Sequence, residues 1–227
     1  MKESGKKVET RIQNVDLVEL RRNQIIEGAI KVFTAKGFHG ATVREIAAEA
    51  GLTMGTLYNY INSKEDIIYI VYDSITNSLR KEMRDSIKGI SDPKERLKAA
   101  LRQNLHSVYQ HQDVIMFIYK ASSLFDRESL HEVLARETEY IELFEGLLRG
   151  YFGDRAIDET RLRLAADLLT YIPIIMTFRR WSLRRRFDSM EDVMQRILDF
   201  VLHGIEFVPE EQAPEAPKKE KKGAEAQ

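Results

Sequence analysis

Hydrophobic residues recur at helical spacing through most of this chain. Within residues 17–36, the apolar side chains of Ile25, Ala29, Val32 and Phe33 fall on one face of a helix. No segment shows the two-residue alternation of apolar and polar positions that marks a half-buried strand. The pattern predicts an all-α fold with about nine helices.

Capping residues and glycines set the expected limits of these helices. Thr42 with Glu45, and Ser63 with Asp66, have the spacing at which two side chains cap a helix N-terminus. Gly51 can adopt the positive φ of a tight turn after a helix. The expected helices cover residues 17–36, 43–50, 54–60, 64–88, 93–109, 114–124, 129–149, 158–184 and 190–207.

The second and third expected helices are short and are joined by a turn at Gly51, as in a helix-turn-helix. Leu52 and Leu57 can face inward, which leaves small and polar residues on the outer side of the helix at 54–60. Such a helix fits the major groove of DNA, which is about 12 Å wide. Gly55 near its start would let the backbone approach a target closely. The segment therefore predicts DNA recognition.

The run ATVREIAAEAGLTMGTLYNYINSKEDI (residues 41–67) resembles the DNA-binding signature of the TetR family of bacterial repressors. The resemblance implies that Thr42 and Lys64 meet phosphates at helix N-termini. It also implies that Tyr58 and Tyr60 touch the DNA backbone or pack beneath it. The implied DNA-binding residues are Thr42, Arg44, Thr53, Met54, Gly55, Thr56, Tyr58, Asn59, Tyr60 and Lys64.

Several of these residues also have a purely structural interpretation. Capping of the helix N-terminus alone can account for Thr42, and this role stabilises a helix by about 1 kcal/mol. Tyr60 can belong to the core, and Lys64 can be an ordinary solvated lysine. Their occurrence together, in register with a helix-turn-helix and its caps, favours DNA binding.

The domain organisation expected from these patterns has four parts. Residues 1–16 are a flexible N-terminal arm, and residues 17–63 are the helix-turn-helix DNA-binding domain. Residues 64–208 form a helical effector-binding and dimerisation domain, as the resemblance implies. Residues 209–227 are rich in Pro, Glu, Lys and Ala and are expected to be a disordered tail.

The resemblance further implies a homodimer that pairs through the two helices at 158–184 and 190–207. A dimer would set the spacing of two half-sites in a pseudo-palindromic operator on double-stranded DNA. The alternative is that the apolar stripes of both helices pack within one subunit. These stripes are Leu162, Ala165, Ala166 and Leu169 on the first helix, and Val193, Ile197, Phe200, Val201 and Ile205 on the second.

By the same resemblance, helices between residues 97 and 178 are expected to enclose a small hydrophobic effector. Pro173 should kink the helix at 158–184, since proline lacks the N–H that a helix interior needs. An arginine cluster that begins at Arg179 suits the phosphates of an acyl-CoA. The alternative for the apolar candidates is ordinary core packing. The candidate effector-binding residues are Tyr109, Phe117, Tyr140, Phe144, Tyr171, Met176, Phe178, Arg179 and Arg180.

Composition narrows the possible chemistry. The net charge is −1, so a DNA-binding surface must be local. The absence of cysteine excludes disulfides, thiolate zinc sites and cysteine nucleophiles. No apolar stretch is long enough to span a membrane and no secretory signal is apparent, so a cytoplasmic protein is expected. No phosphate-binding loop, dinucleotide fingerprint or zinc-protease motif occurs, so neither an enzyme nor a cofactor is expected.

The sequence therefore predicts a dimeric, sequence-specific transcriptional regulator. It is expected to be a repressor that a small hydrophobic ligand releases from its operator, with an acyl-CoA as one candidate. The alternatives are a regulator that is independent of ligand or responds to many drugs, and a helical adaptor protein. The sequence does not define the effector, the operator or the regulated genes.

Overall fold

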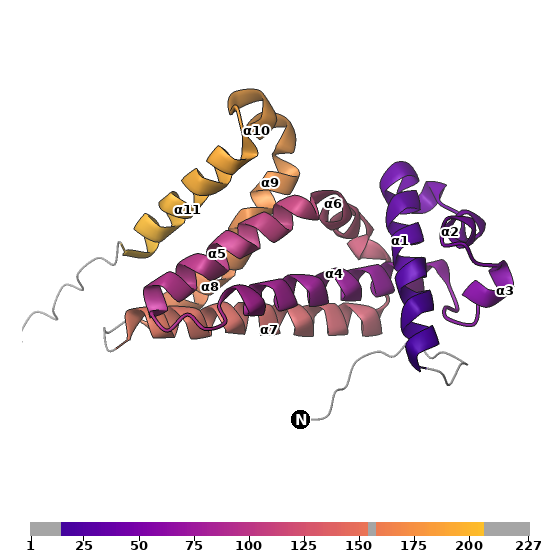
Figure 1. The fold of residues 1–227 in the computed structure, drawn as a ribbon, viewed down its shortest axis with the longest axis horizontal. Helices are drawn as coiled ribbons and strands as arrows, with labels where there is room; N and C mark the ends of the chain where they lie inside the picture. The colour runs from indigo at the N-terminus through magenta and orange to yellow at the C-terminus, as the bar shows by residue number, and fades with distance from the viewer. Residues whose placement is uncertain (1–14, 154–157, 207–227) are drawn as a thin grey trace, which may run out of the picture.

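The computed structural model describes residues 15–153 and 158–206, and the regular elements within these ranges are all helical (Figure 1). The predicted all-α fold is confirmed. Residues 1–14 of the predicted arm and the predicted tail at 209–227 lie outside the described residues. In chain order the elements are α1 (Val15–Gly40), α2 (Val43–Glu49), α3 (Met54–Leu57), α4 (Lys64–Ser86), α5 (Pro93–Gln110), α6 (Gln112–Ala121), the 3₁₀ helix η1 (Ser122–Leu124), α7 (Arg127–Phe152), α8 (Glu159–Tyr171), the 3₁₀ helix η2 (Ile172–Ile174), α9 (Ile175–Phe178), α10 (Arg180–Arg186) and α11 (Met190–Glu206).

The predicted caps form as their spacing indicates. The Thr42 hydroxyl accepts a hydrogen bond from the Glu45 N–H at 3.2 Å, and the Glu45 carboxylate accepts one from the Thr42 N–H at 3.0 Å. Ser63 and Asp66 form the same reciprocal pair at the start of α4. Gly51 has a φ of 66°, as the turn between α2 and α3 requires. Local chemistry therefore fixes where these helices begin.

The helix predicted at 54–60 is shorter than expected. α3 ends at Leu57, and the N–H of Tyr60 then bonds the Leu57 carbonyl at 2.9 Å in a tighter i→i+3 turn. This turn places Tyr60 in the core, where 1% of its surface is exposed. Burial of the Tyr60 ring therefore outweighs continuation of the helix.

The helix predicted at 158–184 is interrupted at Pro173, where a kink was expected, and again at Arg179. The structure has α8, η2, α9 and α10 in this range. Pro173 has no N–H to donate to the carbonyl of Leu169, four residues earlier. The buried side chain of Asn104 donates to that carbonyl instead, at 3.3 Å. A side chain from α5 thus satisfies the acceptor that the proline leaves free.

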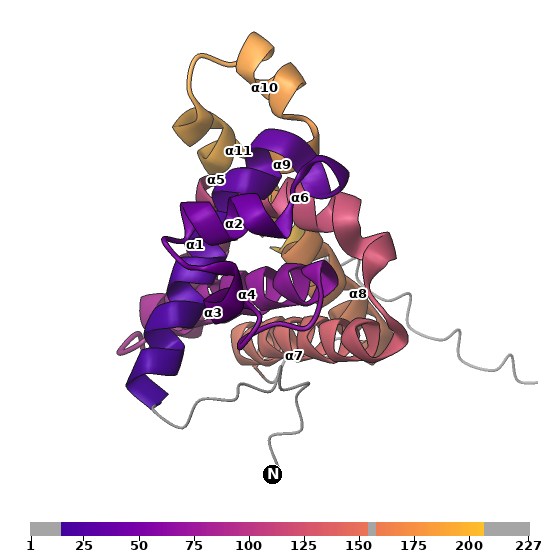
Figure 2. The ribbon, with the colours of Figure 1, turned by 90° about the vertical axis from the view of Figure 1, so that its right-hand side faces the viewer.

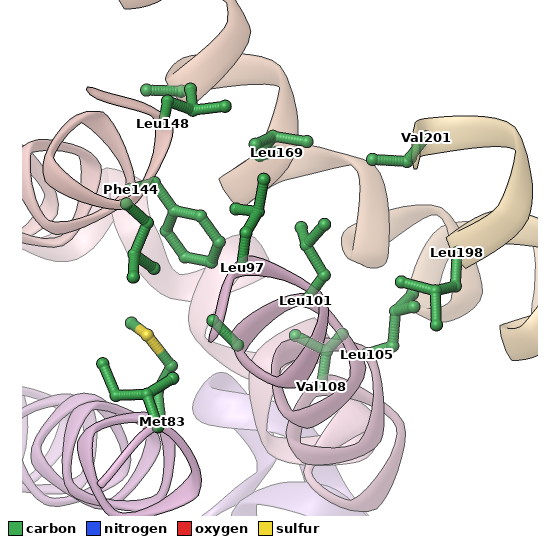
Figure 3. Packing of buried hydrophobic residues seen from close by; sticks show 14 of the residues in the cluster. Met83, Leu97, Leu101, Leu105, Val108, Phe144, Leu148, Leu169, Leu198 and Val201 are labelled. Carbon is green, nitrogen blue, oxygen red and sulfur yellow. The ribbon is translucent and has the colours of Figure 1, made fainter. Parts of the chain in front are cut away.

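Two hydrophobic clusters organise the molecule. One contains residues of α1 to α4 and α6, including Phe33, Ile46 and Leu57. The other joins α5, α7, α8 and α11 around Leu101 and Phe144 (Figure 3). α4 contributes to both, because Ile67 to Ile75 pack in the first cluster and Met83 packs in the second.

The arrangement separates a small end from a larger helical body. α1, α2 and α3 gather at one end of the molecule, and α4 runs from them alongside α7 (Figures 1 and 2). α10 and α11 lie on the opposite side of α5 from α4 and α7 (Figure 1). Among the described helices, none is both long and apolar enough to cross a bilayer.

Candidate functional site

α2, the turn at Gly51 and α3 form a helix-turn-helix whose inner side is fully packed. Ile46, Ala47 and Leu57 are buried against α1 and the first turns of α4. α1 packs tightly against the end of α2 at Gly28, where an added Cβ would lie 2.8 Å from the Ala50 nitrogen. The contact between α1 and α2 therefore leaves no room for a larger residue at Gly28.

The outer side of this unit carries most of the predicted DNA-binding residues. Thr42, Arg44, Thr53 and Tyr58 are exposed, as is Gly55, while the remaining candidates Met54, Thr56 and Asn59 are partly covered. The short helices α2 and α3, which carry or adjoin these residues, lie together at one end of the molecule (Figure 2). Contact with DNA stays a prediction for each of them.

Tyr60 differs from the others because its side chain is buried. Of the two roles predicted for it, the geometry fits packing beneath the surface and leaves no exposed ring for a phosphate. Tyr58, two residues earlier, is 48% exposed and can reach outward.

Lys64 has a role that the sequence did not indicate. Its ammonium donates hydrogen bonds to the carbonyls of Phe38 and Ala41, at 2.8 and 2.9 Å, and lies 4.0 Å from the centre of the Phe38 ring. The lysine therefore ties the start of α4 to the last turn of α1 and to Ala41, which follows it. It is not simply solvated, and a phosphate could use only the remaining N–H. Loss of DNA binding on replacing it would not separate the two roles.

The capping box of α2 is reinforced by a lysine from α1. Glu45 accepts a hydrogen bond from the Lys36 ammonium at 2.6 Å as well as from the backbone and hydroxyl of Thr42. These contacts, Lys36 foremost, lower the pKa of Glu45 from 4.5 to about 2. The carboxylate is thus held charged at the N-terminus of α2, where the helix dipole also favours it.

Replacing Glu45 with glutamine should destabilise the protein at neutral pH. Because the folded-state pKa lies below the ordinary value, the contribution is present above about pH 4.5 and is lost as the pH falls through about 2. Urea unfolding of both proteins should show a difference at pH 7 that shrinks below pH 4. A difference that is independent of pH would contradict the role of the charge.

Gly55 is not required by the fold. A Cβ built there meets nothing within 4 Å. Gly55→Ala should therefore leave the protein folded and slightly more stable, by up to ~1 kcal/mol. If the backbone of α3 approaches DNA closely at this point, the same change should weaken operator binding about 10-fold to 100-fold. Fluorescence anisotropy and thermal unfolding test this pair of effects, and unchanged operator affinity would contradict close approach.

A cavity lies between α4, α5, α6, α7, α8 and η2. Its volume is about 120 Å³, below the ~300–1,000 Å³ usual for sites that enclose a drug-sized ligand. Tyr140 and Tyr171, both predicted from the sequence, lie on its wall. The lining residues are Tyr72, Ile75, Thr76, Leu79, Arg80, Asn104, Val108, Ile115, Ile118, Tyr119, Arg136, Glu137, Tyr140, Thr170, Tyr171 and Ile174.

The other predicted effector-binding residues lie elsewhere. Phe117, Phe144 and Met176 are buried in the two hydrophobic clusters, and Tyr109 packs against one of them. These residues pack in the core, which was the alternative given for them in the sequence analysis. An apolar helical face does not by itself show whether it lines a cavity or packs against another helix.

Phe178 and the arginines after it lie on α9 and α10 and do not line the cavity. Phe178 stacks edge-on against Tyr119, which does line it, with ring centres 5.1 Å apart. Arg179 is exposed, and Arg180 forms an ion pair with Asp113 of α6. The arginine cluster therefore begins beside Phe178, which contacts the cavity wall at Tyr119, rather than inside the cavity.

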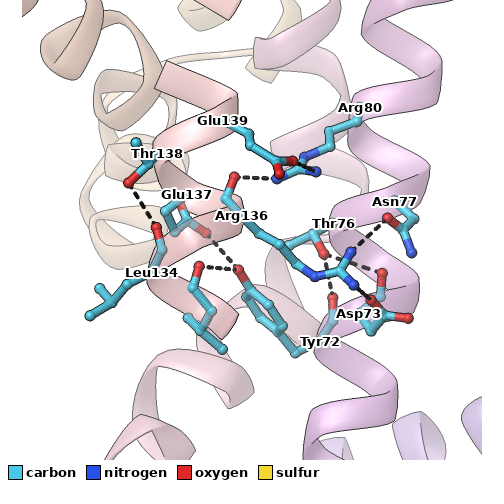
Figure 4. A network of polar contacts seen from close by, with 11 residues as sticks. Tyr72, Asp73, Thr76, Asn77, Arg80, Leu134, Arg136, Glu137, Thr138 and Glu139 are labelled. Carbon is cyan, nitrogen blue, oxygen red and sulfur yellow. Dashed lines mark hydrogen bonds and ion pairs between the residues drawn. The ribbon is translucent and has the colours of Figure 1, made fainter. Parts of the chain in front are cut away.

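The polar wall of the cavity was missed by the sequence analysis. Tyr72 and Arg80 of α4 face Arg136 and Glu137 of α7 in a continuous polar network (Figure 4). The Tyr72 hydroxyl donates to the Glu137 carboxylate at 3.1 Å and to the Val133 carbonyl at 3.2 Å. A signal was present in the sequence, since Tyr72, Thr76 and Arg80 repeat every four residues along one side of α4.

Most residues of the predicted dimerisation stripes face the interior of the subunit and not a partner. Leu162, Ala166 and Leu169 of α8 and Val193 and Val201 of α11 are buried within the subunit. The opposite side of α8 and its continuation carry an exposed apolar row, and Phe200 of α11 is 76% exposed. Helical spacing identified two apolar faces on these helices but not which one the subunit covers. The exposed apolar row consists of Leu164, Leu168, Tyr171, Ile175, Phe178 and Trp181.

Comparisons with known proteins agree with this architecture. Residues 25–69 match the sequence family described as bacterial regulatory proteins, tetR family. The chain is 24% identical to the HTH-type transcriptional regulator HbdR of Aromatoleum sp. (strain CIB), over 86% of this chain and 85% of that one. It is 25% identical to the fatty acid metabolism regulator protein of Bacillus subtilis (strain 168), over 80% of this chain and 94% of the relative.

Among solved structures, AibR in complex with isovaleryl coenzyme A and operator DNA shares the fold. The TM-score is 0.64 at 19% sequence identity, and the match covers 79% of this chain and 97% of AibR. The helix-turn-helix packed on α1 and α4 agrees with the family match. Over residues 25–69 this chain is similar to the bacterial regulatory proteins of the tetR family.

Proposed function

We propose that the protein is a dimeric operator-binding repressor that an acyl-CoA releases from DNA, and that it acts in the cytoplasm by regulation rather than catalysis. The observation that carries the switch is the course of α4. Its N-terminus is tied by Lys64 to the helix-turn-helix, and its middle, from Tyr72 to Arg80, forms one wall of the cavity. A ligand in the cavity thus contacts the same helix that supports the DNA-binding unit.

The DNA-binding role rests on the exposed surface of α2 and α3. Arg44 supplies a cation there, and Tyr58 and Thr53 supply hydroxyl groups that can bond phosphates or base edges. Hydroxyl and methyl groups read bases weakly, so DNA shape is expected to contribute to sequence preference.

The dimer rests on the exposed apolar row of α8 to α10 together with Phe200. A continuous apolar row of this kind is typical of a protein–protein interface. Two subunits paired there would present two copies of α3 to successive half-sites, about 34–36 Å apart on B-DNA.

The acyl-CoA assignment rests on the character of the cavity and on the relatives. Ile75, Leu79, Ile115 and Ile118 provide an aliphatic surface for a hydrocarbon chain. The relative in Bacillus subtilis is named for fatty acid metabolism, and AibR was solved with isovaleryl coenzyme A. Exposed Arg179 follows Phe178, which packs on the lining residue Tyr119, and offers a partner for phosphates outside the cavity.

The ligand must favour the conformation that does not bind DNA, because equal affinity for both states would shift nothing. We infer that an acyl chain in the cavity displaces α4 relative to α7, and that the shift is transmitted through Lys64 to α2 and α3. Displacement of one helix past another is a common form of such switches.

The test begins with selection of duplexes from a random DNA pool by the full-length protein. The expected product is a pseudo-palindrome, and Arg44→Ala should reduce affinity for it about 10-fold. Arg96→Ala on α5 is the matched control, since Arg96 is also exposed but lies outside the helix-turn-helix. Weak, salt-sensitive binding without sequence preference would contradict an operator-binding role.

The selected duplex then reports on effectors. Isovaleryl-, octanoyl- and palmitoyl-CoA are added in turn, and the anisotropy of labelled DNA is recorded at fixed salt. At least one of them should release the protein from DNA. Operator binding that none of the three affects would contradict acyl-CoA as the effector class.

A further inference from the structure

The cavity has two walls of different character. Its aliphatic residues come mainly from α4 and α6, while α7 contributes Arg136, Glu137 and Tyr140, and α4 adds Tyr72 and Arg80 to the polar wall. A simple hydrocarbon chain would use only the aliphatic wall. The polar wall therefore restricts which polar groups a bound ligand can contain.

The two cations of the polar wall are already neutralised. Arg80 pairs with Glu139 at 2.7 Å and also donates to the Arg136 carbonyl. Arg136 pairs with Asp73 at 2.8 Å and donates to the Asn77 side chain at 3.1 Å. Figure 4 shows both guanidinium groups turned toward these partners. Neither arginine has an unmatched charge to offer an anionic ligand.

Glu137 is the charged group of this wall that lacks a counterion. Within the described residues its carboxylate accepts a hydrogen bond from Tyr72, at 3.1 Å, and no ion pair. It lines the cavity and is reachable by solvent.

The remaining polar groups around the cavity do not supply that counterion. The Tyr140 hydroxyl donates to Asn104 at 3.0 Å, and Asn104 is itself bonded to the Leu169 carbonyl. Burial, with smaller contributions from Tyr171 and Glu137, raises the pKa of Tyr119 to about 12, so this phenol is neutral. An entering carboxylate would therefore meet Glu137 beside arginines that are already paired with Glu139 and Asp73.

We propose that Glu137 makes the cavity accept the uncharged acyl portion of a thioester and reject the corresponding free fatty acid. The inference rests on the proposed role of the cavity as the effector site. Two carboxyl groups confined together cannot both ionise without cost, because each disfavours the charged form of the other. A thioester carbonyl has no charge and meets no such repulsion. The regulator would thus sense activated acyl groups and ignore the free acids from which they are made.

Two probes of equal chain length separate the charge from the coenzyme head group. S-octanoyl-N-acetylcysteamine is an uncharged thioester, and octanoate is the free acid. Calorimetric titration of the full-length protein should show that octanoate binds at least ~10-fold more weakly, the equivalent of one pKa unit. Comparable binding of the two probes, or no binding of the thioester, would overturn the proposal.

Glu137→Gln removes the charge and keeps an oxygen that can accept from Tyr72. In this variant octanoate should gain affinity, so that the difference between the probes falls below about 3-fold. Glu142→Gln is the matched control, since Glu142 is exposed on the same helix and does not line the cavity. It should preserve the wild-type difference. A difference that survives in Glu137→Gln would assign the selectivity to another group.

Two separate measurements test the two proposals. Probe binding tests the role of Glu137, and release from the operator tests the effector function. If octanoyl-CoA releases the protein from its operator but the probes bind equally, only the role of Glu137 fails. If the thioester probe binds selectively and no acyl-CoA alters DNA binding, Glu137 retains its role and the proposed switch fails.

Discussion

Replacing Leu168 with glutamate should separate the dimer and reduce operator affinity by roughly 100-fold to 10,000-fold, the range over which linked binding sites gain from acting together. Leu168 lies in the middle of the exposed apolar row and is 51% exposed in the single subunit. A charge there costs little in the monomer but would be buried without a partner in a dimer. The subunit itself should therefore remain folded.

Sedimentation analysis measures the loss of the dimer, and anisotropy with the selected operator measures the loss of affinity. Leu134→Glu on α7 is the matched control, because Leu134 is 57% exposed and lies outside the exposed apolar row. It should remain dimeric. A dimeric Leu168→Glu protein with normal operator binding would place the interface elsewhere.

Replacing Gly28 with alanine should destabilise the helix-turn-helix by about 1–3 kcal/mol, the usual cost of overpacking. The new Cβ would lie 2.8 Å from the nitrogen of Ala50 and 3.1 Å from its Cα. These are backbone atoms at the end of α2, so relief requires moving α2 away from α1. Because the turn at Gly51 connects α2 directly to α3, the displacement should also weaken operator binding.

Gly146→Ala provides the comparison, since Gly146 is exposed inside α7 and a Cβ there meets nothing within 4 Å. This change should stabilise the protein by roughly 0.5–1 kcal/mol, as removal of a glycine from a helix interior does. Urea unfolding measures both variants. A Gly28→Ala protein as stable as Gly146→Ala would show that α1 and α2 can separate without cost.

The helical class, most helix starts and the helix-turn-helix followed from the sequence alone. Thr42 with Glu45 and Ser63 with Asp66 are separated by three residues, and Gly51 stands where a positive φ is needed. These features act over one turn of chain, so local chemistry is sufficient to define them. The surface predicted for DNA contact followed for the same reason, because Leu57 marks the inner side of α3 and its neighbours must face outward.

The tertiary structure decided which apolar faces are buried and which line the cavity. Leu162 and Leu168 are both apolar residues of one helix, yet the first is 1% exposed and the second 51%. Phe144 is core and Tyr140, one turn earlier, lines the cavity. Helical spacing defines a face but not its neighbour. The neighbour depends on contacts between residues far apart in the chain.

The same reason explains the roles of Lys64 and Glu137. Lys64 bonds the carbonyl of Phe38, which precedes it by 26 positions, and Tyr72 meets Glu137 across 65 positions. A lone lysine or glutamate in a sequence gives no sign of such partners. What the sequence by itself determined is therefore everything set within a helical turn, including the DNA-binding unit. What only the tertiary structure decided is the charge balance of the cavity and the exposed apolar row, because both depend on how distant helices pack.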